Sequence, residues 1–246
     1  MAQSLFTILL CLVLFIYLWS ILAHILKLSA SAKLLPWVGL LLLGSIAILC
    51  WFQVKRLPVY GIFETSLHLA LVFSLLVNIT SLRTNFPRIQ PWGHLLTAIL
   101  IGLALTSSGK FNPDYYMYQA LQVQLFFFLR LTSGGILLFA FLLFAFTWIH
   151  ILKYQRSLQS NWLHSAKTAL IFGSIVFLCS EFSGTVWCIQ GYGDLWHWST
   201  NFFESTAMFL LLMLPLHVPP RVRRDLYKSG TGTLCSLAVV LGIIFP

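Results

Sequence analysis

The chain has 246 residues, of which 59% are hydrophobic and only 9% are charged. Soluble globular domains carry about 25% charged residues, so this composition excludes a soluble protein. It predicts an all-α membrane protein, a polytopic helical bundle of about eight transmembrane helices. A net charge of +9 would point to nucleic acid in a soluble protein, but in a membrane protein it reports orientation. We therefore expect a lipid bilayer, and no nucleic acid, around this chain.

Eight apolar runs set the expected layout of the chain. A membrane-spanning helix needs about 20 mostly apolar residues; the fourth run is marginal and the last is short. No stretch remains for a soluble domain, so we expect one integral membrane domain over residues 1–246. The first run lacks the basic flank of a signal peptide, and we expect it to remain as a helix. The expected spans are residues 5–26, 34–52, 62–80, 92–107, 123–149, 168–187, 202–217 and 232–246.

Basic residues are unevenly divided between the two sides of this layout. Lys55, Arg56 and Lys110 fall on one side, and Arg130 lies inside a span. The remaining Lys and Arg residues fall on the other side, and cytoplasmic loops are the ones that collect them. This bias predicts that both termini and the segment 183–199 face outward. The residues on the basic side are Lys27, Lys33, Arg83, Arg88, Lys153, Arg156, Lys167, Arg221, Arg223, Arg224 and Lys228.

The segment Ser183–Ser199, SGTVWCIQGYGDLWHWS, concentrates aromatic rings where two apolar runs meet. We call it the Trp-rich segment. Its rings are those of Trp187, Tyr192, Trp196 and Trp198. Membrane interfaces are enriched in Trp and Tyr, so a simple interfacial belt is one reading. Interleaved glycines, such as Gly193, let a backbone approach a planar ligand closely, so a platform for a flat hydrophobic ligand is the other.

Four charged or titratable groups fall at membrane depth, where such residues usually face a bundle interior or a cavity. Glu64 and His68 are four residues apart and therefore share a helix face. A carboxylate bonded to one ring nitrogen of His68 would leave the other nitrogen for a metal, but a buried polar pair or a hydrated helix start at Glu64 fits equally well. Arg130 and Glu181 form either a polar site or a buried ion pair between spans.

Two further histidines and the cysteines complete the candidate chemistry. His197 lies between Trp196 and Trp198, and His217 lies at the inner end of the seventh span. Spacing alone does not distinguish either histidine. The five cysteines include no CxxC motif, which argues against a dithiol or a structural zinc site.

The Trp-rich segment resembles the heme-handling signature of the cytochrome c assembly family, of the CcsA and CcmC type. That pattern runs approximately S-G-x-V-W-x-x-x-x-W-G-x-x-W-x-W-D-P-K-E-T, and Ser183, Gly184, Trp187, Gly193 and Trp196 are among the residues on it. LPVYGIFETS, residues 57–66, resembles a second family motif, and ALQ, residues 120–122, a third. The chain departs from the pattern at Tyr192, Ser199 and Phe202, and Arg56 stands where the family often has His.

The resemblance implies heme b as a bound and presented ligand, held at the outer face of a bacterial inner membrane for attachment to apocytochrome c. It implies a second membrane partner with a large outer domain, of the CcsB or ResB type. The chain would then belong to a heme-attachment (synthase) system, although no conventional catalytic nucleophile is present. The residues that we expect to bind heme are Trp187, Tyr192, Gly193, Trp196, His197, Trp198, His217 and His68, supported by Glu64, Arg130 and Glu181, with no metal other than heme iron.

Two other functions remain open from the sequence. A regulatory or accessory member of the same fold, similar to the HemX branch, would act without ligating heme. A transporter or a quinone-binding subunit would use Arg130, Glu181, Glu64 and His68 as a polar path, although no inverted repeat supports it.

Overall fold

The computed structural model describes residues 2–82, 89–107, 119–154, 160–193, 200–219 and 224–245. Within these ranges the chain forms eight α-helices and one 3-10 turn, with no strand, which confirms the all-α prediction. Six of the helices, α1, α2, α3, α5, α6 and α8, are long and apolar enough to cross a membrane. The chain is therefore a multi-pass membrane protein.

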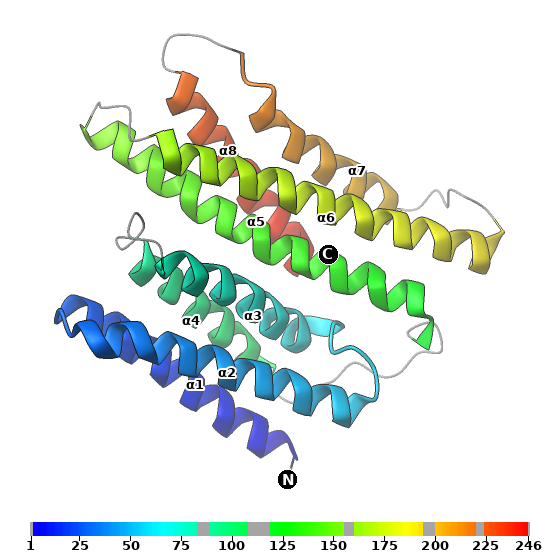
Figure 1. Cartoon of the computed structure of the whole chain (residues 1–246). Helices are drawn as coiled ribbons and strands as arrows, with labels where there is room; N and C mark the ends of the chain where they lie inside the picture. Colours follow the sequence, from blue (N-terminus) through cyan, green and yellow to red (C-terminus); the bar gives the residue numbers. More distant parts are fainter. Residues whose placement is uncertain are drawn as a thin grey trace. The chain divides into compact units, whose positions relative to one another are not determined.

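Helix contacts divide the chain into two compact units, residues 1–119 and 120–246. Unit 1 contains α1 (Ala2–Ile25), α2 (Ser29–Val54), α3 (Gly61–Ser81) and α4 (Gln90–Thr106). In it, each helix packs against its neighbours in sequence, and α1 also packs against α4 (Figure 1). The result is a four-helix bundle in which all four helices line the interior.

A glycine allows α1 and α2 to approach each other closely. A Cβ on Gly39 would lie 2.8 Å from Cε2 of Tyr17, and the Tyr17 side chain is fully buried. Because only a hydrogen fits there, Tyr17 occupies the interior of unit 1. The turn between the two helices is short because Lys27 adopts φ 59, and Leu28 N–H donates to the carbonyl of Ala23 at 2.9 Å. This pattern ends helices abruptly, usually with glycine at the left-handed position.

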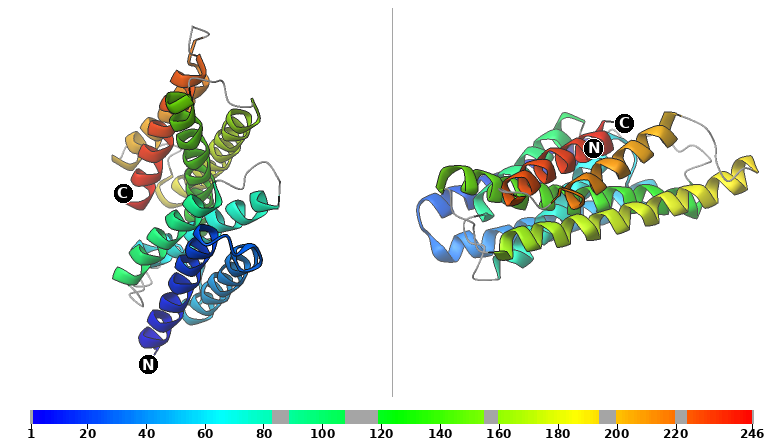
Figure 2. Two further views of the ribbon diagram at one scale, coloured as in Figure 1. Left: turned by 90° about the vertical axis from the view of Figure 1, so that its left-hand side faces the viewer. Right: turned by 90° about the horizontal axis from the view of Figure 1, so that it is seen from above.

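Unit 2 contains α5 (Leu121–Tyr154), α6 (Ser160–Tyr192), α7 (Thr200–Met213), the turn η2 (Leu214–Leu216) and α8 (Arg224–Ile244). The helices α5 and α6 run side by side, and α8 packs against α5 (Figure 2). With 34 and 33 residues, α5 and α6 are each about 50 Å long at 1.5 Å per residue. They exceed the hydrocarbon core of a bilayer, about 30 Å thick, so their ends extend beyond it.

Several expected boundaries in unit 2 were wrong, because α5 continues to Tyr154 and α6 already begins at Ser160. The sixth helix does not end at residue 187 but continues to Tyr192, through the first half of the Trp-rich segment. The last helix begins at Arg224, not at residue 232, and so reaches a length that can span. Its first turns are rich in small residues that face α5: a Cβ on Gly232 would lie 2.7 Å from the Phe144 ring. Close packing on α5 therefore sustains this helix despite its polar sequence.

Candidate functional site

The end of α6 carries the described part of the Trp-rich segment. The rings of Trp187 and Tyr192 meet edge to face, with centroids 5.6 Å apart and planes at 86°. Gly193 ends the helix in a left-handed conformation, φ 70°, and its N–H donates to the carbonyl of Ile189 at 3.0 Å. Edge-to-face contact is a favourable arrangement of two aromatic rings. Tyr192 is exposed, so the pair presents aromatic surface at the helix end.

Three of the predicted site residues, Trp196, His197 and Trp198, fall within residues 194–199 and lie outside the described residues. The described part of the expected ligand surface is therefore Trp187, Tyr192 and Gly193.

The first two residues of the Trp-rich segment pack α6 against α5. The hydroxyl of Ser183 donates to the carbonyl of Gln122 at 2.9 Å. A Cβ on Gly184 would lie 2.9 Å from Cδ2 of Phe126, so this glycine makes room for the ring. Both residues thus join the ends of the two long helices, and they do so one turn before Trp187.

Further along α6 from the aromatic pair, toward the start of the helix, Arg130 of α5 bonds to side chains of α6 and α7. Its Nη1 donates to Oε1 of Glu181 on α6 at 3.3 Å and to Oγ of Ser205 on α7 at 3.1 Å. Its Nη2 lies 3.5 Å from the sulfur of Met208, also on α7. The predicted ion pair between spans is confirmed. Glu181 precedes Trp187 by six residues, which is about 9 Å along the helix.

Arg130 retains hydrogen-bonding capacity in this setting. A guanidinium carries five N–H donors, and a thioether sulfur such as that of Met208 is a weak acceptor. Among the described residues Arg130 makes one ion-pair contact, with Glu181, whose side chain is 30% exposed. A second carboxylate, that of Glu204 on α7, is close enough to interact with it electrostatically. The faces of Phe126 and Phe177 lie 5.3 Å and 5.6 Å from the guanidinium carbon. These apolar faces exclude water and strengthen any interaction that Arg130 makes with an anion.

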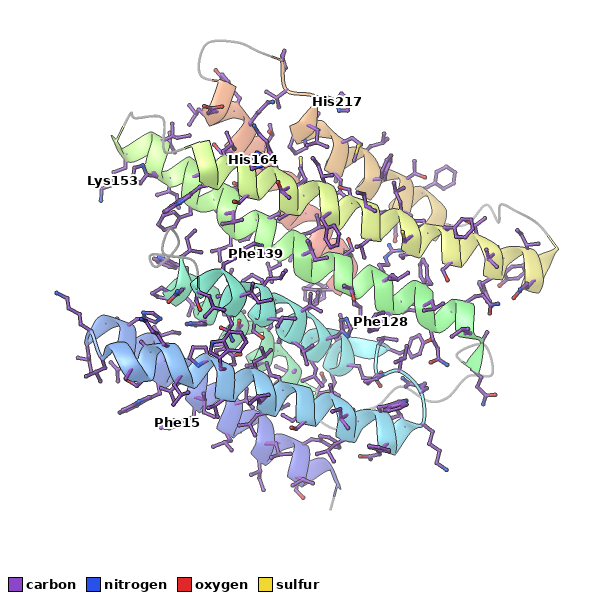
Figure 3. The ribbon with its side chains drawn as sticks, viewed as in Figure 1. Phe15, Phe128, Phe139, Lys153, His164 and His217 are labelled. Carbon is purple, nitrogen blue, oxygen red and sulfur yellow. The ribbon has the colours of Figure 1, made fainter. Side chains whose placement is uncertain are left out.

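His217 lies at the other end of unit 2, past the end of α7 that points away from the end of α6 (Figure 3). Its Nδ1 is 2.8 Å from the carbonyl of Met213. A carbonyl oxygen only accepts, so Nδ1 carries a proton, and in the neutral tautomer of this kind Nε2 is the nitrogen with the lone pair. The side chain is exposed. A histidine oriented in this way, with one nitrogen bonded to a carbonyl, is the usual arrangement of a metal-ligating imidazole.

In unit 1, Glu64 forms an ion pair with Arg56 that the sequence analysis did not predict. It is completely buried, which contradicts a hydrated helix start. Its Oε2 accepts from Nη1 of Arg56 and from Tyr60 N–H, both at 2.8 Å, and its Oε1 accepts from Nη2 of Arg56 at 3.2 Å. The pair forms because the chain turns back between α2 and α3 and brings the guanidinium to the carboxylate.

Arg56 also changes the charge count. It is only 5% exposed and its charge is neutralised by Glu64, so it does not act as a loop charge. Of the three loop cations expected on its side of the membrane, Lys55 and Lys110 remain. The difference in the number of basic residues between the two sides is therefore larger than the sequence count. His68 lies on α3 in unit 1, and the Trp-rich segment belongs to unit 2.

Sequence reasoning missed the α7 side of the Arg130 site, Ser205 and Met208. The one available signal was their spacing of three, which places both on one face of a short apolar helix. Within the described ranges, no three His, Cys, Asp or Glu side chains gather closely enough to hold a metal ion. No protein-family model matches the chain, and no curated protein matches it.

Proposed function

We propose that the protein handles heme in c-type cytochrome biogenesis, binding it and presenting it at the outer end of unit 2. The observation that carries the proposal is the pair of rings, Trp187 and Tyr192, above a guanidinium with hydrogen bonds to spare. Heme is a flat apolar ring with two carboxylates on one edge. Aromatic rings match its faces, and Arg130 matches a carboxylate through a charge-assisted hydrogen bond.

The described residues fit the faces and the anionic edge of heme better than they fit its iron at this end of the unit. None of the described histidines of unit 2 lies beside Trp187; His150, His164 and His217 all belong to the opposite end, where α5 ends and α6 begins. In this proposal His217 holds the iron at the inner end through Nε2, and His197 is the candidate ligand at the outer end. When bound, heme supplies the vinyl groups that join to apocytochrome c. The orientation rests on the basic-residue count.

The experiment is a hemin titration of the detergent-purified chain, followed by the Soret band. We expect two hemes to bind, one at the outer end beside Trp187 and one at the inner end through His217, because these positions lie at opposite ends of unit 2. Trp187→Ala and Arg130→Met should each weaken binding roughly tenfold, as the loss of one stacking or one charged contact does. His197→Ala and His217→Ala should each shift the spectrum toward weaker axial ligation. Trp19→Ala is the matched control, because Trp19 belongs to a similar exposed pair with Phe15, 6.1 Å apart, on α1.

A second function, the HemX-like accessory role, is favoured by the departures from the heme signature, such as Ser199 in place of its Asp. It predicts a chain that binds no heme in the titration. A spectrum unchanged in all four variants would contradict the first function, and a chain that binds no heme would leave the accessory role standing.

A further inference from the structure

Unit 1 contains a buried polar cluster at the end where α1 finishes and α4 begins. Tyr17, Ser20 and His24 follow one another on one face of α1, at spacings of three and four residues. His94 of α4 faces them, with its ring centroid 5.8 Å from that of Tyr17 and 5.7 Å from that of His24. Tyr17, Ser20 and His94 are at most 1% exposed. The cluster thus lies inside the bundle and not on its surface.

Three polar atoms of this cluster lack a hydrogen-bond partner among the described residues: Oγ of Ser20, Nε2 of His24 and Nδ1 of His94. The Tyr17 hydroxyl meets none with good geometry, and its nearest polar neighbour is the side chain of Ser74 on α3. Unsatisfied buried groups are costly, and several at one place call for a bound water, an ion or a functional role. The two imidazole nitrogens belong to different helices, so one bound species that contacts both would also join α1 to α4.

The spacing of the two imidazoles fits a single metal ion. The His24 and His94 rings have centroids 5.7 Å apart and planes at 29°. Two imidazoles that share one ion at a metal–nitrogen distance of about 2.0 Å have ring centroids about 5–6 Å apart. The His24 side chain is only partly buried, so its ring has room to turn and bind such an ion through Nε2.

The donor set selects the class of metal. Hard cations such as Ca²⁺ and Mg²⁺ take carboxylate and carbonyl oxygens, but the one carboxylate of α3, Glu64, lies at the other end of that helix and is bonded to Arg56. Neutral imidazoles favour copper and zinc. The cluster offers no anionic side chain to offset a buried positive charge, and a divalent ion costs more to desolvate than a monovalent one. We propose that His24 and His94 together bind one monovalent copper ion, Cu(I), with the Tyr17 or Ser20 hydroxyl or water as any further ligand.

The test is a Cu(I) titration of the full chain in detergent, without heme and under reducing conditions, against a chromogenic copper chelator. We expect one equivalent to bind to the wild type. His24→Asn and His94→Asn should each weaken binding roughly tenfold or more, because each removes one of two imidazole ligands. His164→Asn is the matched control, since His164 is an exposed helix histidine of unit 2, and it should leave the affinity unchanged.

X-ray absorption of the copper-loaded wild type makes the result independent of whether the variants fold. Scattering from two imidazoles supports the site. Thiolate ligation, no bound equivalent in the wild type, or unchanged binding in both variants would each overturn the proposal; in the last two cases water alone fills the cluster. The copper titration contains no heme, so its failure is separate from a failure of heme binding at unit 2.

Discussion

Among the described residues each unit contains one Arg–Glu ion pair, and the two pairs differ in how closely the guanidinium and the carboxylate meet. In unit 1 Arg56 and Glu64 meet through two bonds of 2.8 Å and 3.2 Å, and Tyr60 N–H adds a third to the carboxylate. The Arg56 guanidinium also lies 4.6 Å above the Tyr60 ring. The side chains are 4% and 0% exposed. This pair uses its acceptors internally, and it closes the connection between α2 and α3.

In unit 2 Arg130 and Glu181 meet through one bond of 3.3 Å, and both side chains are more exposed than those of the first pair. Arg130 divides its remaining bonds between Ser205 and a thioether. A deeply buried pair joined by two bonds maintains a local structure, whereas a more exposed pair joined by one longer bond can rearrange around an added anion. The comparison therefore indicates a structural role for Arg56–Glu64 and supports the binding role that we propose for Arg130, and variants of each can test the division.

The largest effect is expected from Glu64→Gln. This change leaves the Arg56 charge buried without a carboxylate, and breaking a buried pair in this way costs about 3–5 kcal/mol. Unfolding of the purified chain in detergent, followed by circular dichroism during denaturant titration, measures the loss. Lys55→Met is the matched control, because Lys55 is the exposed cation next to Arg56 and should change stability little.

The double variant Arg56→Met with Glu64→Gln should recover most of that stability, because the uncompensated charge is gone and the Gln oxygen still accepts from Tyr60 N–H. A double variant that is as unstable as the single one would mean that the pair contributes more than its charge balance, and would weaken the comparison.

A smaller loss of stability is expected from Arg130→Met. The variant removes hydrogen bonds to a charged donor, each worth about 1.5–3 kcal/mol when well formed, but the bond to Glu181 is long, at 3.3 Å, and the carboxylate is only partly buried. We expect a loss of about 1–2 kcal/mol in the same unfolding measurement. A loss as large as that of Glu64→Gln would show that Arg130 is also structural, and would remove the argument for its binding role.

Hydropathy alone predicted the helical fold, because each apolar run that buries itself in lipid must satisfy its backbone internally. It missed boundaries where a helix is maintained by packing. The start of α8 reads as polar and glycine-rich, yet Gly230 lies against Trp148 and Gly232 against Phe144. Hydropathy averaged over a sequence window does not contain this information, because the fit of a glycine to a ring on another helix depends on the fold.

The candidate site was predicted in part for a related reason. Arg130 and Glu181 are conspicuous because charge is rare at membrane depth, and few partners exist for them. Arg56 lies in a loop, as expected from its sequence neighbours Lys55 and Pro58, but it was expected to be an exposed charge. Its burial results from the turn that brings it back to Glu64, eight residues later. The polar cluster of His24 and His94 depends on the pairing of α1 with α4, which no local spacing indicates.

The smallest effect is expected at Ser183, where the roles of packing and binding can be separated. Its hydroxyl joins α6 to the Gln122 carbonyl of α5, whereas Thr185 bonds only to the Glu181 carbonyl of its own helix. Ser183→Ala should therefore lower stability by about 0.5–1.5 kcal/mol and leave hemin affinity unchanged, and Thr185→Ala should alter both little. Ser183 begins the segment that resembles a heme signature, so the opposite result is informative. Unchanged stability with weakened hemin binding would mean that the serine faces the ligand, and that the ends of α5 and α6 separate when heme binds.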